Sequence, residues 1–228
     1  MSYSNVSIKT WPDRTALMRG IADTVASELR RALATNGQAS LAVPGGTTPG
    51  PFLEMLSEED MDWSNVTVLL TDERVVPEDS DRSNTRLVRE TLLHNHAAQA
   101  TLINYNAGAD PLNEARERVH AILPIDVLVL GMGADMHTAS LFPDAKELED
   151  AVADDAPVLV EVNPAGQPES RLSLSGPVLK SAKNAHILIQ GPEKMTALET
   201  ALEDGPAAEA PVRTVFEAER PVTVHYAT

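Results

Sequence analysis

Residues 125–138 read IDVLVLGMGADMHT, and this stretch carries the clearest fold signal in the chain. Its first half, residues 125–130, is an almost continuous apolar run, typical of a strand that is buried on both faces of a sheet. A glycine-rich turn at residues 131–133 follows directly, with Asp135 and His137 just beyond it. Because ligands of open α/β sheets bind beyond the carboxyl ends of the strands, this stretch predicts a buried parallel strand and one wall of a binding site.

Working outward, similar apolar runs alternate with segments of helical periodicity along the whole chain. Strands are predicted at residues 40–43, 66–70, 158–162, 171–174, 185–189 and 222–226, and helices at residues 16–34, 49–56, 84–93, 112–123 and 195–202. Apolar strands separated by helices indicate an α/β fold: an open, mostly parallel, Rossmann-like sheet with helices on both faces. No stretch resembles a linker between domains, so one domain is predicted over residues 1–228.

The composition restricts the class of protein. No run of about 18 apolar residues occurs, so no transmembrane helix is expected, and the polar amino-terminal residues do not resemble a signal peptide. The chain has no cysteine, which excludes disulfides and thiolate chemistry. The cytoplasm is therefore the default expectation for its location.

The net charge of −16 argues against nucleic acid and anionic membranes as partners. A small anionic substrate would need a local basic pocket, which makes each basic residue near a motif a candidate. The oligomeric state does not follow from the sequence.

The segment PGGTTP at residues 44–49 follows a predicted strand and opens a predicted helix. Gly45 and Gly46 allow a close backbone approach, and Thr47 and Thr48 add hydroxyl donors, with Thr48 also the expected helix N-cap. Exposed N–H groups at such a turn favour a phosphate. The alternative is an ordinary strand-to-helix turn.

The segment TDER at residues 71–74 follows the next strand. Asp72 can bind sugar hydroxyls or move protons, and Arg74 can pair with an anion. The alternative is a solvated charge cluster. Ser83 is the expected cap of the helix at residues 84–93.

Three further side chains are candidates for the same site. His137 can accept a proton near neutral pH, and Asp135 is close enough in sequence to orient it. Arg171 opens a predicted strand, while Lys194 lies in the first turn of a helix, where a cation is unfavourable unless an anion binds there. Loop and surface positions are the alternatives. Neither a metal nor a cofactor is expected. The remaining histidines suggest no metal site; they are His94, His96, His120, His186 and His225.

Taken together, these segments resemble the 6-phosphogluconolactonase family. The matching stretches occur in the family's order: VPGGTTP at 43–49, TDER at 71–74 with SN at 83–84, GMGAD at 131–135, HTASLFP at 137–143, Arg171, and GPEK at 191–194. The resemblance implies an open α/β sheet shared with amino-sugar-phosphate and ribose-5-phosphate isomerases. It also implies hydrolysis of 6-phospho-D-glucono-1,5-lactone, a step of the oxidative pentose phosphate pathway.

The resemblance implies a role for each candidate residue. Residues 45–48, Arg171 and Lys194 would hold the phosphate, Asp72 and Arg74 would line the sugar site, and His137 would be the base that activates water. One departure is Met136, which stands where the family usually has glycine. If the backbone there needs a positive φ, methionine is strained.

Two other functions fit parts of the pattern. A glucosamine-6-phosphate deaminase/isomerase would share the glycine loop, the Asp72 segment and the histidine turn, but that family places a glutamate where this chain has Phe142, and phenylalanine cannot relay protons. A non-catalytic sugar-phosphate sensor usually accompanies a DNA-binding segment, and none is evident here.

Overall fold

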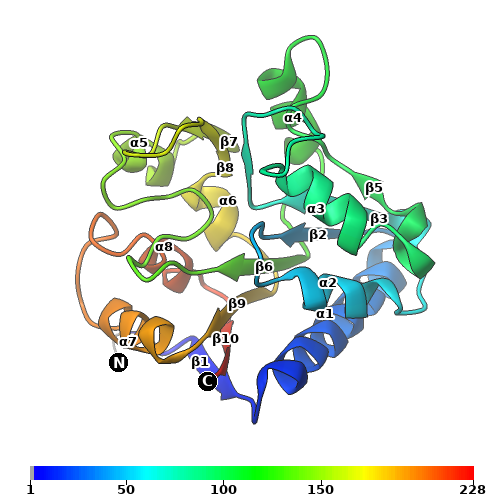
Figure 1. Cartoon of the computed structure of the whole chain (residues 1–228), viewed down its shortest axis with the longest axis horizontal. Helices are drawn as coiled ribbons and strands as arrows, with labels where there is room; N and C mark the ends of the chain where they lie inside the picture. Colours follow the sequence, from blue (N-terminus) through cyan, green and yellow to red (C-terminus); the bar gives the residue numbers. More distant parts are fainter. Residues whose placement is uncertain (1–2) are drawn as a thin grey trace.

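The computed structural model describes residues 3–228 and has a seven-stranded sheet at its centre (Figure 1). The strand order is β1-β10-β9-β6-β2-β3-β5, and every pairing in this sheet is parallel. The strands are β1 (Val6–Thr10), β2 (Ala39–Val43), β3 (Val66–Leu70), β5 (Thr101–Leu102), β6 (Val127–Gly131), β9 (Ala185–Gln190) and β10 (Val222–Ala227). The predicted open parallel sheet is confirmed.

Helices cover the two faces of this sheet. On one face α1 packs against α2, and on the other α6 packs against α8. The helices are α1 (Arg14–Asn36), α2 (Gly50–Ser57), α3 (Asn84–Thr91), α4 (Pro111–His120), α5 (Leu148–Val152), α6 (Gly176–Lys180), α7 (Pro192–Ala201) and α8 (Arg213–Phe216), with short 3₁₀ turns at Trp63–Asn65 and Asn95–Gln99. No helix within residues 3–228 is long and apolar enough to span a membrane.

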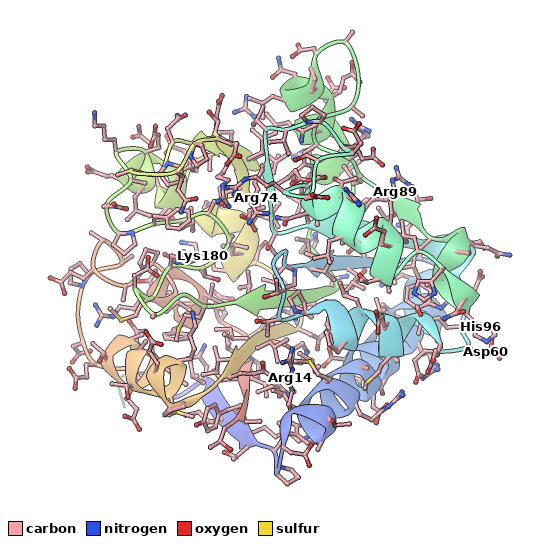
Figure 2. All side chains as sticks on the ribbon, in the orientation of Figure 1. Arg14, Asp60, Arg74, Arg89, His96 and Lys180 are labelled. Carbon is pink, nitrogen blue, oxygen red and sulfur yellow. The ribbon has the colours of Figure 1, made fainter. Side chains whose placement is uncertain are left out.

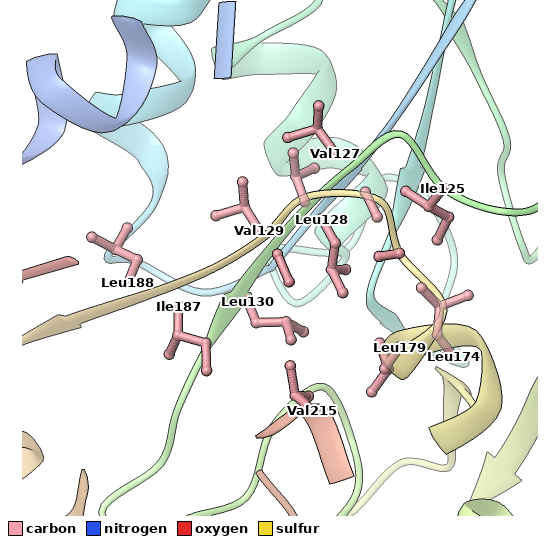
Figure 3. Packing of buried hydrophobic residues seen from close by; sticks show 14 of the residues in the cluster. Ile125, Val127, Leu128, Val129, Leu130, Leu174, Leu179, Ile187, Leu188 and Val215 are labelled. Carbon is pink, nitrogen blue, oxygen red and sulfur yellow. The ribbon is translucent and has the colours of Figure 1, made fainter. Parts of the chain in front are cut away.

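Side-chain alternation along the central strands separates the two layers. In Figure 3, Val127, Val129 and Leu188 point toward the layer of α1 and α2, whereas Leu130 and Ile187 point toward Leu179 and Val215 on the other side. All five residues of β2 are buried, as are four of the five in β3. Strands covered on both faces have no polar face, which explains their continuous apolar sequence.

Two predicted strands do not belong to the central sheet. The strands β7 (Leu159–Val162) and β8 (Arg171–Leu174) pair with β4 (Asp72–Arg74) in a separate antiparallel sheet of order β4-β8-β7. The pairing places Arg74 opposite Arg171 and Asp72 opposite Ser173. This small sheet therefore brings the segment Asp72–Arg74 beside two consecutive strands that are distant from it in sequence.

Several predicted boundaries need correction. The helix predicted at residues 112–123 ends at His120, because residues 121–123 turn before Pro124 and a proline disfavours helical backbone in the residue before it. The edge strand β1 was missed because four of its five residues are exposed and it has no buried run to recognise. The helix predicted at residues 84–93 begins at Asn84 as expected but ends at Thr91. Its Ser83 cap is confirmed, since the Ser83 side chain accepts a hydrogen bond from the Arg86 backbone N–H.

The order in which successive strands are added to the sheet changes side between β2 and β6. From β2 the chain proceeds to β3 and β5 on one side, and from β6 to β9 and β10 on the other. Since β2 and β6 are neighbours, the loops after them diverge and leave a crevice at their carboxyl ends. Open α/β sheets bind their ligands at such a switch point.

A buried pair of histidines lies between the sheet and α1. His186 Nδ1 is 3.1 Å from His225 Nε2, and His186 Nε2 is 2.7 Å from Glu28 Oε2. The sequence had suggested no partner for either histidine. Burial, together with the nearby charges of His186 and Lys9, lowers the pKa of His225 to about 3, so His225 is neutral in the folded protein.

Candidate active site

A cavity of about 270 Å³ opens at the carboxyl ends of β2, β3, β6 and β9. The cavity is lined by all nine residues that the sequence predicted for catalysis or binding. They are Gly45, Gly46, Thr47, Thr48, Asp72, Arg74, His137, Arg171 and Lys194. They come from five separate segments of the chain, and the fold brings all of them to one place.

The loop after β2 forms one wall of the cavity. A Cβ on Gly45 would lie 2.0 Å from Oδ1 of Asn84, and Gly46 has a φ of 88°. Both positions therefore require glycine, one for space and the other for backbone conformation. Thr48 is not the N-cap predicted from the sequence: α2 starts at Gly50, and no side chain caps it. Thr48 lines the cavity instead.

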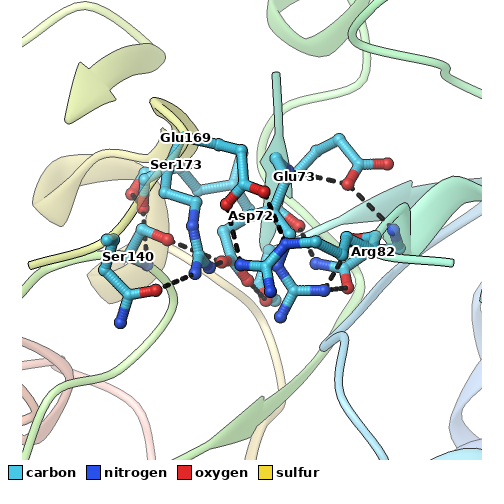
Figure 4. A network of polar contacts seen from close by, with 12 residues as sticks. Asp72, Glu73, Arg82, Ser140, Glu169 and Ser173 are labelled. Atoms are coloured by element: carbon cyan, nitrogen blue, oxygen red, sulfur yellow. Dashed lines mark hydrogen bonds and ion pairs between the residues drawn. The ribbon is translucent and has the colours of Figure 1, made fainter. Parts of the chain in front are cut away.

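Asp72 is held at the floor of the cavity by groups from distant segments (Figure 4). Its Oδ2 accepts a hydrogen bond of 2.6 Å from Ser140 Oγ and lies 3.6 Å from Arg171 Nη1. Burial lowers the pKa of Arg171, and Arg74 contributes in the same direction, while Asp72 opposes the shift. Asp72 is thus a fixed carboxylate, and Arg171 keeps its guanidinium inside the protein partly because of it.

The carboxylate of the neighbouring Glu73 points to the amino terminus of α3 and does not line the cavity. Its carboxylate accepts hydrogen bonds from the backbone N–H groups of Asn84 (2.8 Å) and Thr85 (2.7 Å) and from Ser83 Oγ (3.2 Å). It therefore caps the amino terminus of α3, where a negative charge is favourable. Within the segment 71–74, Asp72 and Arg74 line the cavity while Glu73 fixes the helix behind it.

Arg74 reaches the cavity with part of its guanidinium uncommitted. Its Nη1 donates to the carbonyl of Arg82 at 2.6 Å. Its Nε and the Nε of Arg171 are both buried and have no hydrogen-bond partner within residues 3–228. Because an unpaired buried N–H is costly, two such donors at a cavity wall point to an oxygen-rich ligand.

His137 and Asp135 form a close pair on the loop after β6. His137 Nδ1 lies 2.5 Å from Asp135 Oδ1, and the imidazole packs against Phe142 with 4.4 Å between ring centroids. Burial alone would raise the pKa of Asp135, but the charge and hydrogen bonds of His137 outweigh this and lower it. With Nδ1 donating to the carboxylate, Nε2 is the nitrogen that can accept a proton.

The turn that presents this pair is tightly constrained. A Cβ on Gly133 would lie 2.1 Å from both Asp135 Oδ1 and His137 Nδ1. The Gly133 N–H donates to the carbonyl of His137 at 2.8 Å. Met136 has a φ of 64°, which is the left-handed conformation that favours glycine. The sequence had raised this possibility, and the methionine backbone is strained there.

Lys194 approaches the cavity from the first turn of α7, as predicted. Its Nζ donates to the carbonyl of Met132 at 2.8 Å, which leaves two of its three N–H donors for a ligand. The same wall contains Gln190, the last residue of β9. Sequence reasoning missed Gln190; its only signal was its position at the end of an apolar strand.

No metal site is evident in the part of the chain that the structure describes, since no group of three or more His, Asp or Glu side chains is arranged to hold an ion. His96 is exposed at the rim of the molecule, far from Arg74 in the view of Figure 2.

Comparison with known proteins gives this cavity a context. Residues 12–224 match the family model of glucosamine-6-phosphate isomerases and 6-phosphogluconolactonases. The chain belongs to this family. A 6-phosphogluconolactonase from Pseudomonas aeruginosa is 43% identical over 239 aligned residues, covering 98% of this chain and 95% of the relative. One from Rhizobium meliloti is 39% identical, covering 93% and 95%.

Solved structures in the family agree with the fold. The crystal structure of a 6-phosphogluconolactonase from Shewanella baltica is similar to this chain over the full length of both, with a TM-score of 0.95 and 35% sequence identity. The resemblance inferred from the ordered motifs is therefore confirmed at the level of the family.

Proposed function

We propose that this protein hydrolyses 6-phospho-D-glucono-1,5-lactone to 6-phosphogluconate in the oxidative pentose phosphate pathway. The observation that carries the proposal is a single cavity that combines buried, unpaired cationic donors with the partly exposed imidazole of His137, which is paired with Asp135. Its full-length relatives from Pseudomonas aeruginosa and Rhizobium meliloti are named 6-phosphogluconolactonases.

The phosphate would bind between the loop at residues 45–48, Arg171 and Lys194. The glycines allow close approach to the backbone, and the two cations offset the strongly acidic character of the rest of the chain. Binding the phosphate away from the reacting carbon orients the lactone and lowers the entropic part of the barrier.

His137 would act as the general base. Its side chain is 31% exposed and lines the cavity, while Asp135 holds the ring and stabilises the imidazolium that forms. Water loses a proton to Nε2 and adds to the lactone carbonyl carbon. The bond from this carbon to the ring oxygen then breaks, and the ring oxygen takes the proton from His137.

The tetrahedral intermediate needs a donor for its oxyanion. Arg74 fits this role because its buried Nε is uncommitted. The Gly133 N–H fits it less well, since it already donates to the His137 carbonyl. Asp72, held by Ser140, would accept hydrogen bonds from the sugar hydroxyls.

The contact between Phe142 and His137 favours a lactonase over a deaminase/isomerase. The ring lies directly against the imidazole, at the position where that rival function needs a carboxylate to relay protons. The phenyl ring beside the histidine provides no second acid or base at this position.

The experiment is a direct assay of the purified protein. It should accelerate acid release from 6-phosphogluconolactone relative to a protein-free control, because the lactone also opens spontaneously. It should release no ammonia from glucosamine 6-phosphate. Ammonia release, or lactone opening at the control rate, would contradict the proposal.

We also propose that residues 1–228 act as a single domain with a small sugar phosphate as partner. Both sheets contribute to the one cavity: the central sheet provides the loops after β2 and β6, and the small sheet provides Asp72, Arg74 and Arg171. Neither sheet forms the complete set alone.

A further inference from the structure

One polar group in the cavity has no role in the reaction described above. Gln190 ends β9 and lines the cavity, and its Nε2 is buried without a hydrogen-bond partner within residues 3–228. The other buried, unpaired donors that belong to cavity-lining side chains are Arg74 Nε and Arg171 Nε. An amide that has lost water and gained no partner is unfavourable until a ligand oxygen pairs with it.

The side of the cavity on which Gln190 lies follows from strand alternation. His186, on the same strand, contacts Glu28 of α1, and Leu188 points toward the layer of α1 and α2 (Figure 3). Side chains two residues apart on a strand share a face, so Gln190 faces this layer as well. The glycine loop at residues 44–49 leads directly into α2 of the same layer.

The backbone after Gln190 also connects it to a proposed phosphate ligand. Gly191, with a φ of 82°, turns the chain into α7, whose first turn carries Lys194 into the same cavity. Gln190 and Lys194 therefore reach the same cavity from positions four residues apart, and residues 44–49 line that cavity too. His137 lies on a loop that contacts the opposite layer. In this loop the Met136 carbonyl accepts a hydrogen bond from the backbone N–H of Val212, which precedes α8.

We infer that Gln190 is a phosphate-positioning residue, and that its Nε2 donates a hydrogen bond to a phosphoryl oxygen of the substrate. This inference deepens the proposed function and rests on it for the identity of the substrate. A neutral amide adds a directional donor beside two cations, so it fixes the orientation of the phosphoryl group without adding charge.

The test compares Gln190→Met with the wild-type protein, using inorganic phosphate and 6-phosphogluconate as probes in titration calorimetry. Methionine keeps the length and volume of the side chain and removes the donor. The dissociation constants of both probes should rise about tenfold, the effect of losing one hydrogen bond to a charged group. Gln190→Glu should weaken binding further, because a carboxylate repels the phosphate.

In the lactonase assay, Gln190→Met should raise KM for 6-phosphogluconolactone with little change in kcat, and should leave unphosphorylated gluconolactone unaffected. Gln38→Met is the matched control, since Gln38 is exposed just before β2, at the opposite end of the strands. Unchanged affinity for inorganic phosphate in the Gln190 variants would overturn the inference, as would an equal loss on gluconolactone. Because phosphate binding is measured without turnover, this outcome is separable from a failure of the lactonase proposal.

Discussion

Replacing Gly133 with alanine tests whether the orientation of His137 limits catalysis. The new Cβ would lie 2.1 Å from His137 Nδ1 and from Asp135 Oδ1, whereas ordinary contact begins at 3.4 Å. The His–Asp pair must therefore retreat by about 1.3 Å, the difference between these two distances. Gly133 has no left-handed φ, so the backbone itself accepts alanine and the effect is confined to the pair.

A displacement of about 1 Å at a catalytic group costs on the order of 10²-fold in rate. We therefore expect kcat for 6-phosphogluconolactone to fall about 10²-fold. KM should change little, because the side chains proposed to hold the phosphate are on other loops. The assay is continuous acid release, corrected for the protein-free rate, with thermal unfolding measured in parallel to show that the variant is folded.

Gly50→Ala is the matched control. Gly50 is the first residue of α2 and is buried, but a Cβ at this position would have Thr91 Cγ2 as its nearest heavy atom, at 4.0 Å, an ordinary contact. Its kcat should remain within about twofold of wild type, since no group needs to move. A folded Gly133→Ala protein with wild-type kcat and an unchanged pH profile would refute the reasoning that this turn holds His137 in its working position.

Three other predictions concern the base, the phosphate site and the buried histidine pair. His137→Asn should lower kcat by about 10²–10⁴-fold with little change in KM; near-normal turnover would remove His137 from the mechanism and make Asp72 the leading candidate for the base. Arg171→Ala and Lys194→Ala should each weaken binding of the phosphorylated lactone by roughly 1.5–3 kcal/mol and affect gluconolactone much less, and equal losses on both substrates in steady-state kinetics would contradict a phosphate role. Because the pKa of His225 is about 3 in the folded protein and ordinarily 6.5, the unfolded chain takes up a proton that the folded chain does not. The stability that this group contributes is therefore complete above pH 6.5 and is lost as the pH falls toward 3, by about 2–3 kcal/mol at pH 4.5. Denaturant unfolding between pH 8 and 4.5 checks this for the wild type, for His225→Gln and for the exposed control His96→Gln. If the free energy of unfolding changed with pH equally in all three proteins, the prediction would be contradicted.

The sequence alone determined the fold class and the set of candidate residues. Buried strands have no polar face, so the mainly apolar run at residues 66–70 was located to the residue, as the bounds of β3 show. The bounds of β8 at residues 171–174, where polar and apolar residues alternate, were located equally well. The site motifs were visible because glycines, an acid–arginine pair and a histidine each follow a strand, and strand ends meet at one edge of a sheet.

The sequence could not determine which strands pair or which side chains meet. Residues 171–174 alternate polar and apolar side chains, unlike the central strands, but this pattern does not reveal that their partner is Asp72–Arg74 in a second sheet. Periodicity reports how a segment is buried, whereas pairing depends on partners far away in the chain. The charged segment itself was not recognised as a strand because its three residues are too few and too polar to show alternation.

Only the tertiary structure decided the roles that depend on contact at long sequence separation. Ser140 holds Asp72 across 68 positions of sequence, and His186 meets His225 across 39. Glu73 and Asp72 are adjacent and chemically alike, yet one caps a helix and the other lines the cavity. Gln190 carries no motif, and its unpaired amide appears only once the surrounding chain has removed it from water. Local sequence encodes local conformation, but desolvation and pairing are properties of the folded chain as a whole.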